Sequence, residues 1–253
     1  MQVRQEKQFR KQTKPGTVEM KEAITNLNTM MKTTNYNKWM FDRMKPYLGE
    51  RILEIGCGIG NMTELFLKNK QTELVVGIDI SSQCLDIIND RLGGHKKFKS
   101  YLYDVCNENI SELKKYNFDT IVCVNVLEHI ENDTGVLKNM AEFFPAVTLI
   151  TWVPALKKLY GTIDEADSHF RRYSKQEIET KLRQSGWKIL KGSYLNLLGM
   201  PVWFLHGKLL KKSLHPPKQT CFLDQLIFLE VLLEKIINPP FGLSLLYICK
   251  HTH

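Results

Sequence analysis

A glycine-rich turn, Glu54-Ile55-Gly56-Cys57-Gly58-Ile59-Gly60, joins a strand-like run to a helix-like run and sets the topology of the chain. Residues 51–55 before it form a predicted strand, and residues 61–69 after it form a predicted helix. Three glycines at alternate positions make a turn without side-chain bulk, so a ligand can lie against the backbone beside the helix N-terminus. The spacing differs from the G-x-G-x-x-G of dinucleotide sites. The acid at Glu54 favours a ligand that carries an ammonium group.

Strand-like and helix-like runs alternate on the C-terminal side of this turn. The predicted strands are 51–55, 74–78, 99–103, 120–124, 146–153, 187–194 and 243–249. The predicted helices between them are 61–69, 82–92, 109–115, 134–144 and 175–186, the last opened by a Ser174 and Glu177 capping box. Such alternation predicts an α/β fold with a Rossmann-like, doubly wound, mostly parallel seven-stranded sheet.

The remaining segments divide the chain into three predicted parts. Residues 1–16 read as a flexible basic tail, 17–48 as an N-terminal helical cap, and 49–253 as the main domain. A helical insertion at 195–240 precedes the last strand. It admits two interpretations, helices that cap the core or a groove that binds a lipid or polyprenyl chain. One predicted helical stripe in it consists of Phe222, Leu226, Leu229, Leu233 and Ile236.

Polar residues stand where the next three strands end. Asp79 ends the second strand, 19 residues after Gly60, where an acid can accept hydrogen bonds from both hydroxyls of a ribose. Asp104 follows the third strand and is placed to bond an adenine amino group. Asn125 ends the fourth strand and is followed by Val126-Leu127-Glu128-His129. The carboxyl ends of parallel strands meet at one edge, so these residues are expected to share one site.

These four features together resemble the class I S-adenosylmethionine (SAM)-dependent methyltransferases over roughly residues 35–195. The resemblance implies SAM as cofactor, S-adenosylhomocysteine (SAH) as product, and no metal. It implies that Glu54, Gly56 and Gly58 border the methionine moiety, that Asp79 holds the ribose, and that Asp104 and Val105 border the adenine. Cys57, Ile80 and Asn125 are assigned to the same cofactor site, with Cys57 filling space between the elements.

The acceptor is expected at the same edge, between the N-terminal helices and residues 154–173. The candidate catalytic residues are Tyr36, His129, Asp164 and Asp167, and the candidate substrate-binding residues are Trp39, Tyr160, Asp164, His169 and Arg172. A histidine is the usual general base where one is used, although a packing role for His129 is the alternative. The acids of 154–173 either attract an amine acceptor or pair with Arg171 and Arg172.

Residues 156–173 and Asn196-Leu197-Leu198-Gly199 also resemble a bacterial subgroup that modifies small molecules and natural products, including plantazolicin-type N-methyltransferases. This implies methyl transfer to a nitrogen or oxygen of a small-molecule or peptide natural product, with an amine as the expected acceptor. A lipid- or polyprenyl-linked acceptor is an alternative. An RNA methyltransferase is disfavoured, because the Asn/Asp-Pro-Pro-aromatic motif of RNA base-amine enzymes is replaced here by Asn125-Val126-Leu127-Glu128.

Composition bears on three other classes: proteins that bind nucleic acid, proteins with a structural metal, and proteins that span a membrane. The 253 residues carry 35 basic and 27 acidic side chains, a net charge of +8, which suits an anionic partner but forms no recognisable nucleic-acid motif. None of the six cysteines forms a C-x-x-C pair, which favours a reduced, cytoplasmic compartment and disfavours a structural metal. No apolar run reaches the length of a membrane span. The oligomeric state is not predicted.

Overall fold

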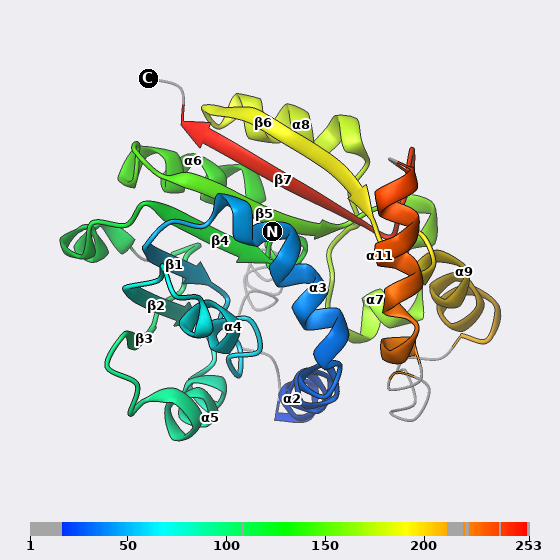
Figure 1. The fold of residues 1–253 in the computed structure, drawn as a ribbon, viewed down its shortest axis with the longest axis horizontal. Coiled ribbons are helices and arrows are strands. Elements are labelled where there is room, and N and C mark those ends of the chain that lie inside the picture. The colour runs from blue at the N-terminus through cyan, green and yellow to red at the C-terminus, as the bar shows by residue number, and fades with distance from the viewer. Residues whose placement is uncertain (1–16, 108, 212–219, 221–222, 238, 252–253) are drawn as a thin grey trace, which may run out of the picture.

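The computed structural model describes residues 17–107, 109–211, 220, 223–237 and 239–251 and contains a seven-stranded sheet (Figure 1). Its strand order is β3-β2-β1-β4-β5-β7-β6, with β1 to β5 parallel and β7 antiparallel to both β5 and β6. This confirms the predicted Rossmann-like sheet. The strands are β1 (Arg51–Ile55), β2 (Leu74–Asp79), β3 (Phe98–Leu102), β4 (Thr120–Val124), β5 (Thr148–Pro154), β6 (Trp187–Leu195) and β7 (Ser244–His251).

Helices cover both faces of the sheet, as the apolar strands require. The α-helices are α2 (Thr17–Met31), α3 (Thr34–Met44), α4 (Thr63–Lys68), α5 (Ser82–Leu92), α6 (Asp133–Phe143), α7 (Thr162–Ala166), α8 (Lys175–Gln184), α9 (Gly199–Trp203) and α11 (Ile227–Ile236). Shorter helical turns are η2 (Lys45–Tyr47), η3 (Ile110–Tyr116), η4 (Leu127–His129), η5 (Lys157–Leu159) and the π-helical η6 (Phe204–Leu209). The helix expected at 109–115 is thus a 3₁₀ helix, and the stretch expected to be a polar loop contains α7.

Two apolar cores lie on opposite faces of the sheet. In one, Leu53 and Ile55 of β1 pack with α6 and α8 residues such as Leu137 and Leu182. In the other, Ile52 of β1 packs with residues of α3, α4 and α5. Alternate residues of β1 therefore point into opposite cores, because successive side chains of a strand lie on opposite faces of the sheet. The two faces of the sheet are therefore buried, and the polar residues lie where the parallel strands end.

The register of the parallel strands brings four chain turns to one edge. Ile55 of β1 is paired with Ile78 of β2 and with Cys123 of β4, and Asp79 is paired with Leu102 of β3. The segments that follow these strands therefore leave the sheet at the same level. They hold the glycine-rich turn, Asp79, Asp104 and Asn125, as expected.

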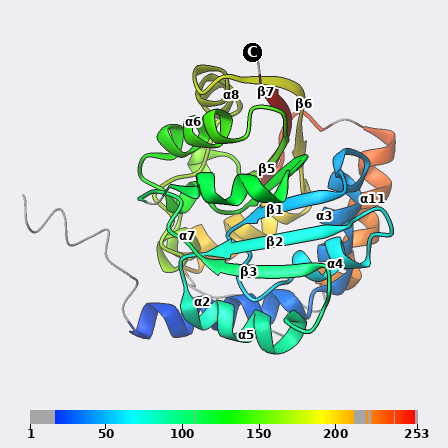
Figure 2. The same ribbon diagram turned by 90° about the vertical axis from the view of Figure 1, so that its left-hand side faces the viewer.

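The N-terminal helix α2 lies beside this edge, at the same end of the molecule as α5 (Figures 1 and 2). The backbone carbonyl of Leu27 accepts a hydrogen bond from Asn61 Nδ2 at 3.0 Å, and its side chain packs against Gly58. Asn26 donates to Asp167 Oδ1 at 2.7 Å. Helix α2 thus connects the glycine-rich turn to the segment before β6. The predicted tail, 1–16, lies outside the described residues.

The predicted stripe in the insertion runs along α11 and is only partly buried. Leu229 and Ile236 are exposed, whereas Glu230, on the opposite side of the helix, is buried. Ile227 and Val231 are the apolar residues that pack on the core. Leu226 and Leu233 are partly buried, and Phe222 lies outside the described residues. The helix therefore turns part of its apolar stripe toward solvent and buries Glu230.

Candidate cofactor and acceptor site

The glycine-rich turn has the backbone that only glycine adopts easily. Gly56, Gly58 and Gly60 have φ of 71°, 52° and 89°, in the left-handed region. At Gly56, a Cβ atom would lie 2.3 Å from Val126 Cγ2, so the turn after β1 is pressed against the segment after β4. The amide groups of Gly56 and Cys57 donate to Ile78 O at 2.8 and 3.1 Å, which fixes the turn on β2. The result is a cradle without side chains, formed by residues 56–60 and bordered by β2 and by the segment after β4.

Asp79 is tied to this cradle. Its Oδ2 accepts the amide hydrogen of Gly58 at 2.8 Å, and its Oδ1 accepts that of Ser81 at 2.9 Å. Burial raises its pKa, although the backbone hydrogen bonds act in the opposite direction. Each carboxylate oxygen has a second lone pair, which leaves acceptor capacity for ribose hydroxyls. The geometry fits the predicted role.

Glu54 is a buried acid at the start of the cradle. Its Oε2 accepts a hydrogen bond from Thr63 Oγ1 at 2.5 Å. Burial raises its pKa to about 8, and the nearby Asp79 carboxylate adds to this effect. A buried carboxyl group with a raised pKa is favourable for a cationic neighbour, because the cation restores the charged form. The ammonium group of methionine is such a cation.

The other predicted cofactor residues lie along the same edge. Cys57 is buried, and its Sγ would lie 2.9 Å from a Cβ added to Gly77, which fits the expected space-filling role. Ile80 is half exposed beside Asp79. Asp104 accepts from Cys106 N at 2.9 Å and from Asn107 Nδ2 at 2.7 Å, so it also closes its own turn, next to Val105. Their contacts with a cofactor stay predictions. Asn125 is exposed, with φ of 51°, and its amide donates to Trp152 O at 2.9 Å.

Two predicted acceptor residues, Tyr36 and Trp39, lie against the core instead of an open pocket. Trp39 is 3% exposed, donates to Glu234 Oε2 at 3.1 Å, and packs edge-on against Trp152 at 5.4 Å. The ring of Tyr36 lies 5.3 Å from that of Trp39, and burial raises its pKa to about 12. The structure thus packs the Trp39 indole between α3 and β5, and its contact with a substrate stays a prediction.

The segment 154–173 was expected to present charges to the acceptor, yet its central pair is internal. Asp164 and Arg172 are both buried, and Arg172 Nε lies 2.7 Å from Asp164 Oδ1. Arg172 also donates to Ala155 O at 3.0 Å and lies over the Trp203 ring at 4.3 Å. Asp164 Oδ2 accepts from Gly161 N at 3.0 Å. Direct substrate contacts by these two residues are not supported, because their polar atoms are occupied by the protein.

Three side chains from two separate segments meet beside the segment after β4. Glu128 and His129 belong to η4, and His169 follows α7. The two histidine rings pack edge to face, with 4.7 Å between their centroids. The loop is fastened to η4 because Phe170 N donates to Glu128 O at 2.8 Å and Tyr173 Oη donates to Leu127 O at 3.0 Å. The sequence pairs Glu128 with His129 as neighbours but does not connect either of them to His169. Only the fold brings residues 128 and 169 together.

Two other predicted residues support this segment. Tyr160 Oη donates to His169 O at 2.8 Å, which holds the backbone of that histidine. Asp167 bonds Asn26 of α2, and burial raises its pKa. Arg171 lies 3.1 Å from Asp133 Oδ2, and not beside the acids of its own segment. Residues 154–173 thus present the His169 ring, beside the His129 ring of η4, and not a free acidic patch, to the acceptor side.

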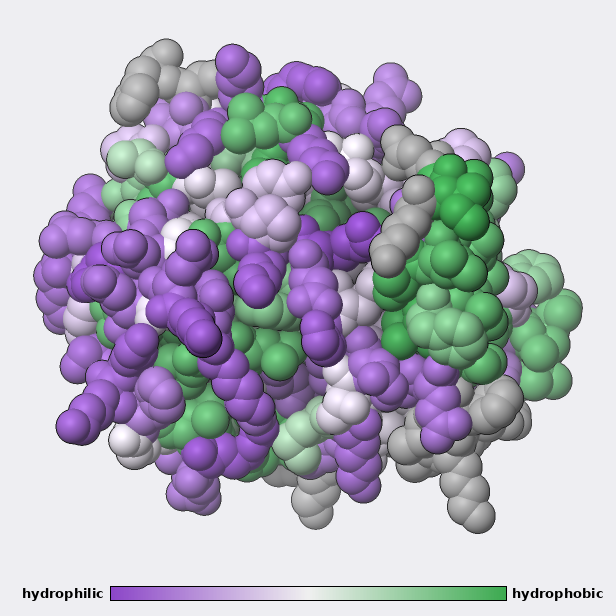
Figure 3. All heavy atoms as spheres, viewed as in Figure 1, coloured by the Kyte–Doolittle hydropathy of each residue, from purple (hydrophilic) through white to green (hydrophobic). Residues whose placement is uncertain are grey.

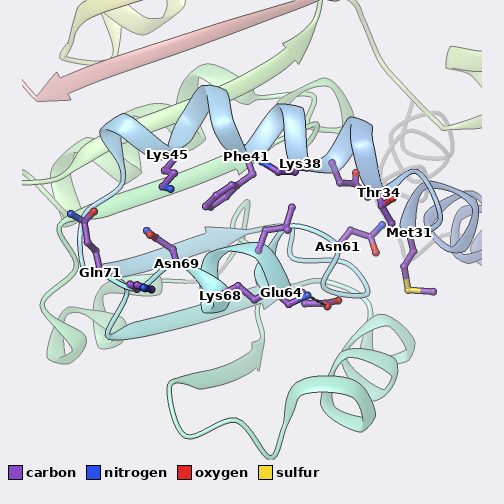
Figure 4. A pocket seen from close by; sticks show the side chains of 13 residues that line it. Met31, Thr34, Lys38, Phe41, Lys45, Asn61, Glu64, Lys68, Asn69 and Gln71 are labelled. Carbon is purple, nitrogen blue, oxygen red and sulfur yellow. Dashed lines mark hydrogen bonds and ion pairs between the residues drawn. The ribbon is translucent and has the colours of Figure 1, made fainter. Parts of the chain in front are cut away.

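A separate groove of about 700 Å³ lies between α3 and α4, on the other side of α4 from the cradle (Figure 4). Lys38, Phe41 and Lys45 line it from α3 and η2, and Glu64 and Lys68 line it from α4. Lys38 pairs with Asp42 and Lys68 pairs with Glu64, both one helical turn apart. These pairs are ordinary surface ion pairs. Asn61 and Asn37, which line this groove, also donate hydrogen bonds to backbone carbonyl groups of α2.

Comparison with known proteins assigns the class. Residues 53–144 match the family model described as a methyltransferase domain. Over 100 residues the chain is 27% identical to the ubiquinone biosynthesis O-methyltransferase of Paracidovorax citrulli, and over 101 residues it is 30% identical to that of Thiobacillus denitrificans. Each match covers 40% of this chain and 41% of the relative. A solved SAM-dependent methyltransferase from Mesorhizobium loti superposes with a TM-score of 0.58 at 13% identity, covering 85% of this chain and 98% of that one.

Residues 53–144 therefore form a SAM-dependent methyltransferase domain, with SAM as its methyl donor. The matched region, 53–144, spans the glycine-rich turn, Asp79, Asp104 and η4. The segments outside it are those that were expected to face the acceptor. None of the helices in the described part of the chain is long and apolar enough to cross a membrane.

Proposed function

We propose that the chain transfers a methyl group from SAM to a hydroxyl oxygen of a small-molecule acceptor, at the edge where the cradle meets η4. The observation that carries this proposal is the contact between Gly56 and Val126. It brings the turn expected to border the methionine moiety against the segment that continues, two residues later, into Glu128 and His129. Donor and proton-accepting groups then share one site.

The chain's own residues hold the donor and exclude water. The cradle at Gly56 and Gly58 admits the methionine backbone, Glu54 offers charge to its ammonium group, and Asp79 offers acceptors to the ribose. Bound SAM supplies a sulfonium-activated methyl group. The acceptor oxygen loses its proton and its lone pair forms a bond to the methyl carbon, while the carbon–sulfur bond breaks and its electrons stay on sulfur. Alignment of the two reactants accounts for much of the rate.

A hydroxyl acceptor is favoured over the amine that the acidic segment suggested. The carboxylate of Asp164 is neutralised inside the protein by Arg172, so it offers no field to a cationic acceptor. The groups gathered after β4 are Glu128, His129 and His169, which can accept a proton. A hydroxyl acceptor needs such a group, whereas an amine that arrives deprotonated does not. The relatives named O-methyltransferases support the same choice.

The test uses pairs of compounds that differ only in carrying a hydroxyl or an amino group on the same ring or sugar. Formation of SAH and of the methylated product is followed by mass spectrometry, with SAM carrying a labelled methyl group. The proposal expects label in the hydroxyl member of at least one pair and less in its amino partner. Label confined to amino members would overturn the choice of atom. The Asp79→Ala variant is the control for SAM-dependent turnover.

A second candidate acceptor carries a long apolar chain, and the orientation of α11 favours it. Glu230 accepts from Leu197 N and Leu198 N at 2.6 and 2.8 Å, and Glu234 bonds Trp39 and Arg43. Both acids of α11 thus point into the protein. Its outward residues are Phe228, Leu232 and Ile236, which are 59%, 52% and 72% exposed.

These side chains form a continuous apolar area over α11 in Figure 3. Exposed apolar patches of this kind mark sites of contact with proteins or lipids. The relatives that are named for ubiquinone biosynthesis point the same way, because ubiquinone carries a polyprenyl chain. We infer that α11 contacts the apolar part of such an acceptor or the membrane that holds it.

Flotation with vesicles of neutral and acidic phospholipid at low salt tests this second candidate. The parent chain is expected to float, and the Phe228→Ser, Leu232→Ser double variant is expected to stay with the soluble fraction. Leu190→Ser is the matched control, because Leu190 is 55% exposed on β6, away from α11. Failure of the parent to float would contradict contact with a membrane.

A further inference from the structure

Glu128, His129 and His169 bring one ligand atom each to within 4.8 Å of one another. Two histidine nitrogens and one carboxylate oxygen form a donor set that binds divalent transition metals and leaves positions open. Ligands at tetrahedral angles around an ion at about 2.1 Å lie roughly 3.4 Å apart, so closing the set requires the ligand atoms to approach one another by up to about 1.4 Å. His129 is exposed on one side and has room to make this shift.

Glu128 supplies an independent observation. Its side chain is fully buried, and neither carboxylate oxygen has a hydrogen-bond partner in the described part of the chain. A buried carboxylate without partners is costly, and proteins usually satisfy it with donors or a cation. Arg172, the nearby cation, is already engaged by Asp164 and Ala155. The charges of His169 and Arg172 act on Glu128, but no donor reaches its carboxylate oxygens in the described part of the chain, which leaves them free to bind a cation.

The histidines are held in the way that metal ligands are held. His169 Nδ1 lies 2.9 Å from Asp164 Oδ1, and the Asp164 carboxylate is itself fixed by Arg172. With its Nδ1 proton directed to Asp164, the neutral ring presents the bare Nε2 to the cluster. A carboxylate that orients a histidine in this manner is a common outer partner of metal ligands. The backbone of Ser168 does the same for the His129 ring by hydrogen bonding to it.

We propose that Glu128, His129 and His169 bind one divalent transition-metal ion, with Asp164 as the positioning residue for His169. The role of this ion in catalysis rests on the proposed function above. An ion here lies beside the cradle and has open positions for the acceptor, so it selects acceptors that offer an oxygen. It also lowers the pKa of a hydroxyl that it contacts, which removes the need for a strong base. The expectation of a site without metal is revised by this proposal.

The test is a titration of the full chain, freed of metal with a chelator, with Mn²⁺ as the probe. Loss of the electron paramagnetic resonance signal of free Mn²⁺ measures binding without reference to activity, and Zn²⁺ is added as a competitor. We expect one ion per chain, displaced by Zn²⁺. Glu128→Gln and His169→Ala are expected to weaken binding by about tenfold or more. His95→Ala is the matched control, because His95 is an exposed histidine on the far side of α5 and is expected to change nothing.

Glu128→Gln keeps the shape of the side chain and breaks no hydrogen bond that the carboxylate makes, so the variant is expected to fold; circular dichroism checks this. Failure of both Mn²⁺ and Zn²⁺ to bind, or unchanged binding by folded Glu128→Gln and His169→Ala, would overturn the proposal. A chain that binds SAH but no ion would refute the metal site alone. A chain that binds the ion but transfers no methyl group would refute the proposed function alone.

Discussion

Arg172 Nε lies 2.7 Å from Asp164 Oδ1, and both side chains are almost fully withdrawn from solvent. The pair ties the end of the segment before α8 to α7, and it orients His169 through the second contact of the same oxygen. Breaking one partner of a buried pair leaves an uncompensated charge. The Arg172–Asp164 pair therefore stabilises the segment that holds His169 on the acceptor side.

Replacing Arg172 by Met is expected to destabilise the chain by about 3–5 kcal/mol, because the Asp164 carboxylate is left buried and unpaired. Chemical denaturation measures the free energy of unfolding. Arg183→Ala is the control, since Arg183 pairs with Glu179 on the surface of α8, where the loss is expected to stay within about 0.5 kcal/mol. An Arg172→Met chain as stable as the parent would show that the pair supports nothing and would return Arg172 to the list of acceptor-binding residues.

Gly56→Ala tests the cradle. The new Cβ atom meets Val126 Cγ2 at 2.3 Å and sits on a backbone with φ of 71°, so a loss of stability of about 1–3 kcal/mol and weaker SAH binding are expected. Adding Val126→Ala is expected to relieve the clash but not the backbone strain. Gly94→Ala is the matched control, because nothing lies within 4 Å of its added Cβ. Equal melting temperatures for Gly56→Ala and Gly94→Ala would count against the described turn.

Glu54 gives a dependence of stability on pH. Its pKa in the folded chain is about 8, above the ordinary value of 4.5, because the site is buried. The folded chain therefore holds a proton that the unfolded chain releases. The stability from this group is complete below about pH 4.5 and is lost as pH rises toward 8.

Unfolding free energies measured from pH 5 to pH 9 without SAM check this slope. Glu54→Gln is expected to remove the part of the slope that Glu54 causes, whereas Glu73→Gln, at an exposed position, is expected to leave it. Bound SAH is expected to flatten the slope in the parent, since its ammonium group favours the charged carboxylate. An unchanged slope in Glu54→Gln would mean that Glu54 is charged in the folded chain throughout this range.

The strands of the sheet and the cofactor edge were predictable from sequence because they depend on local patterns. The seven strands, the glycine-rich turn and Asp79 at the end of β2 follow from apolar runs of strand length and from the spacing between Gly60 and Asp79. The capping of α8 by Ser174, whose Oγ accepts from Glu177 N at 3.2 Å, was also readable from two residues. Such features need no knowledge of distant contacts.

The acceptor side was less predictable because its polar residues are paired over long distances. The pattern of 154–173 left two alternatives open, acids that attract an acceptor or acids that pair with Arg171 and Arg172. It could not show that Arg172 joins Asp164 inside the protein while Arg171 reaches Asp133. The inward acids of α11 are a similar case. A helical stripe of leucines predicts burial, but Glu230 and Glu234 bind backbone amides and Arg43 and so hold the helix the other way round. Tertiary hydrogen bonds here override the hydrophobic pattern.

The central claim is that the turn after β1 and Asp79 hold the methyl donor. Calorimetric titration of the parent chain with SAH tests it most directly, beside Asp79→Ala and the control Asp86→Ala on the exposed side of α5. We expect one SAH per chain in the parent and the control. A hydrogen bond to a charged group contributes about 1.5–3 kcal/mol, so Asp79→Ala should bind roughly 10- to 100-fold more weakly. No saturable binding of SAH by the parent, or equal affinity in Asp79→Ala, would contradict the account.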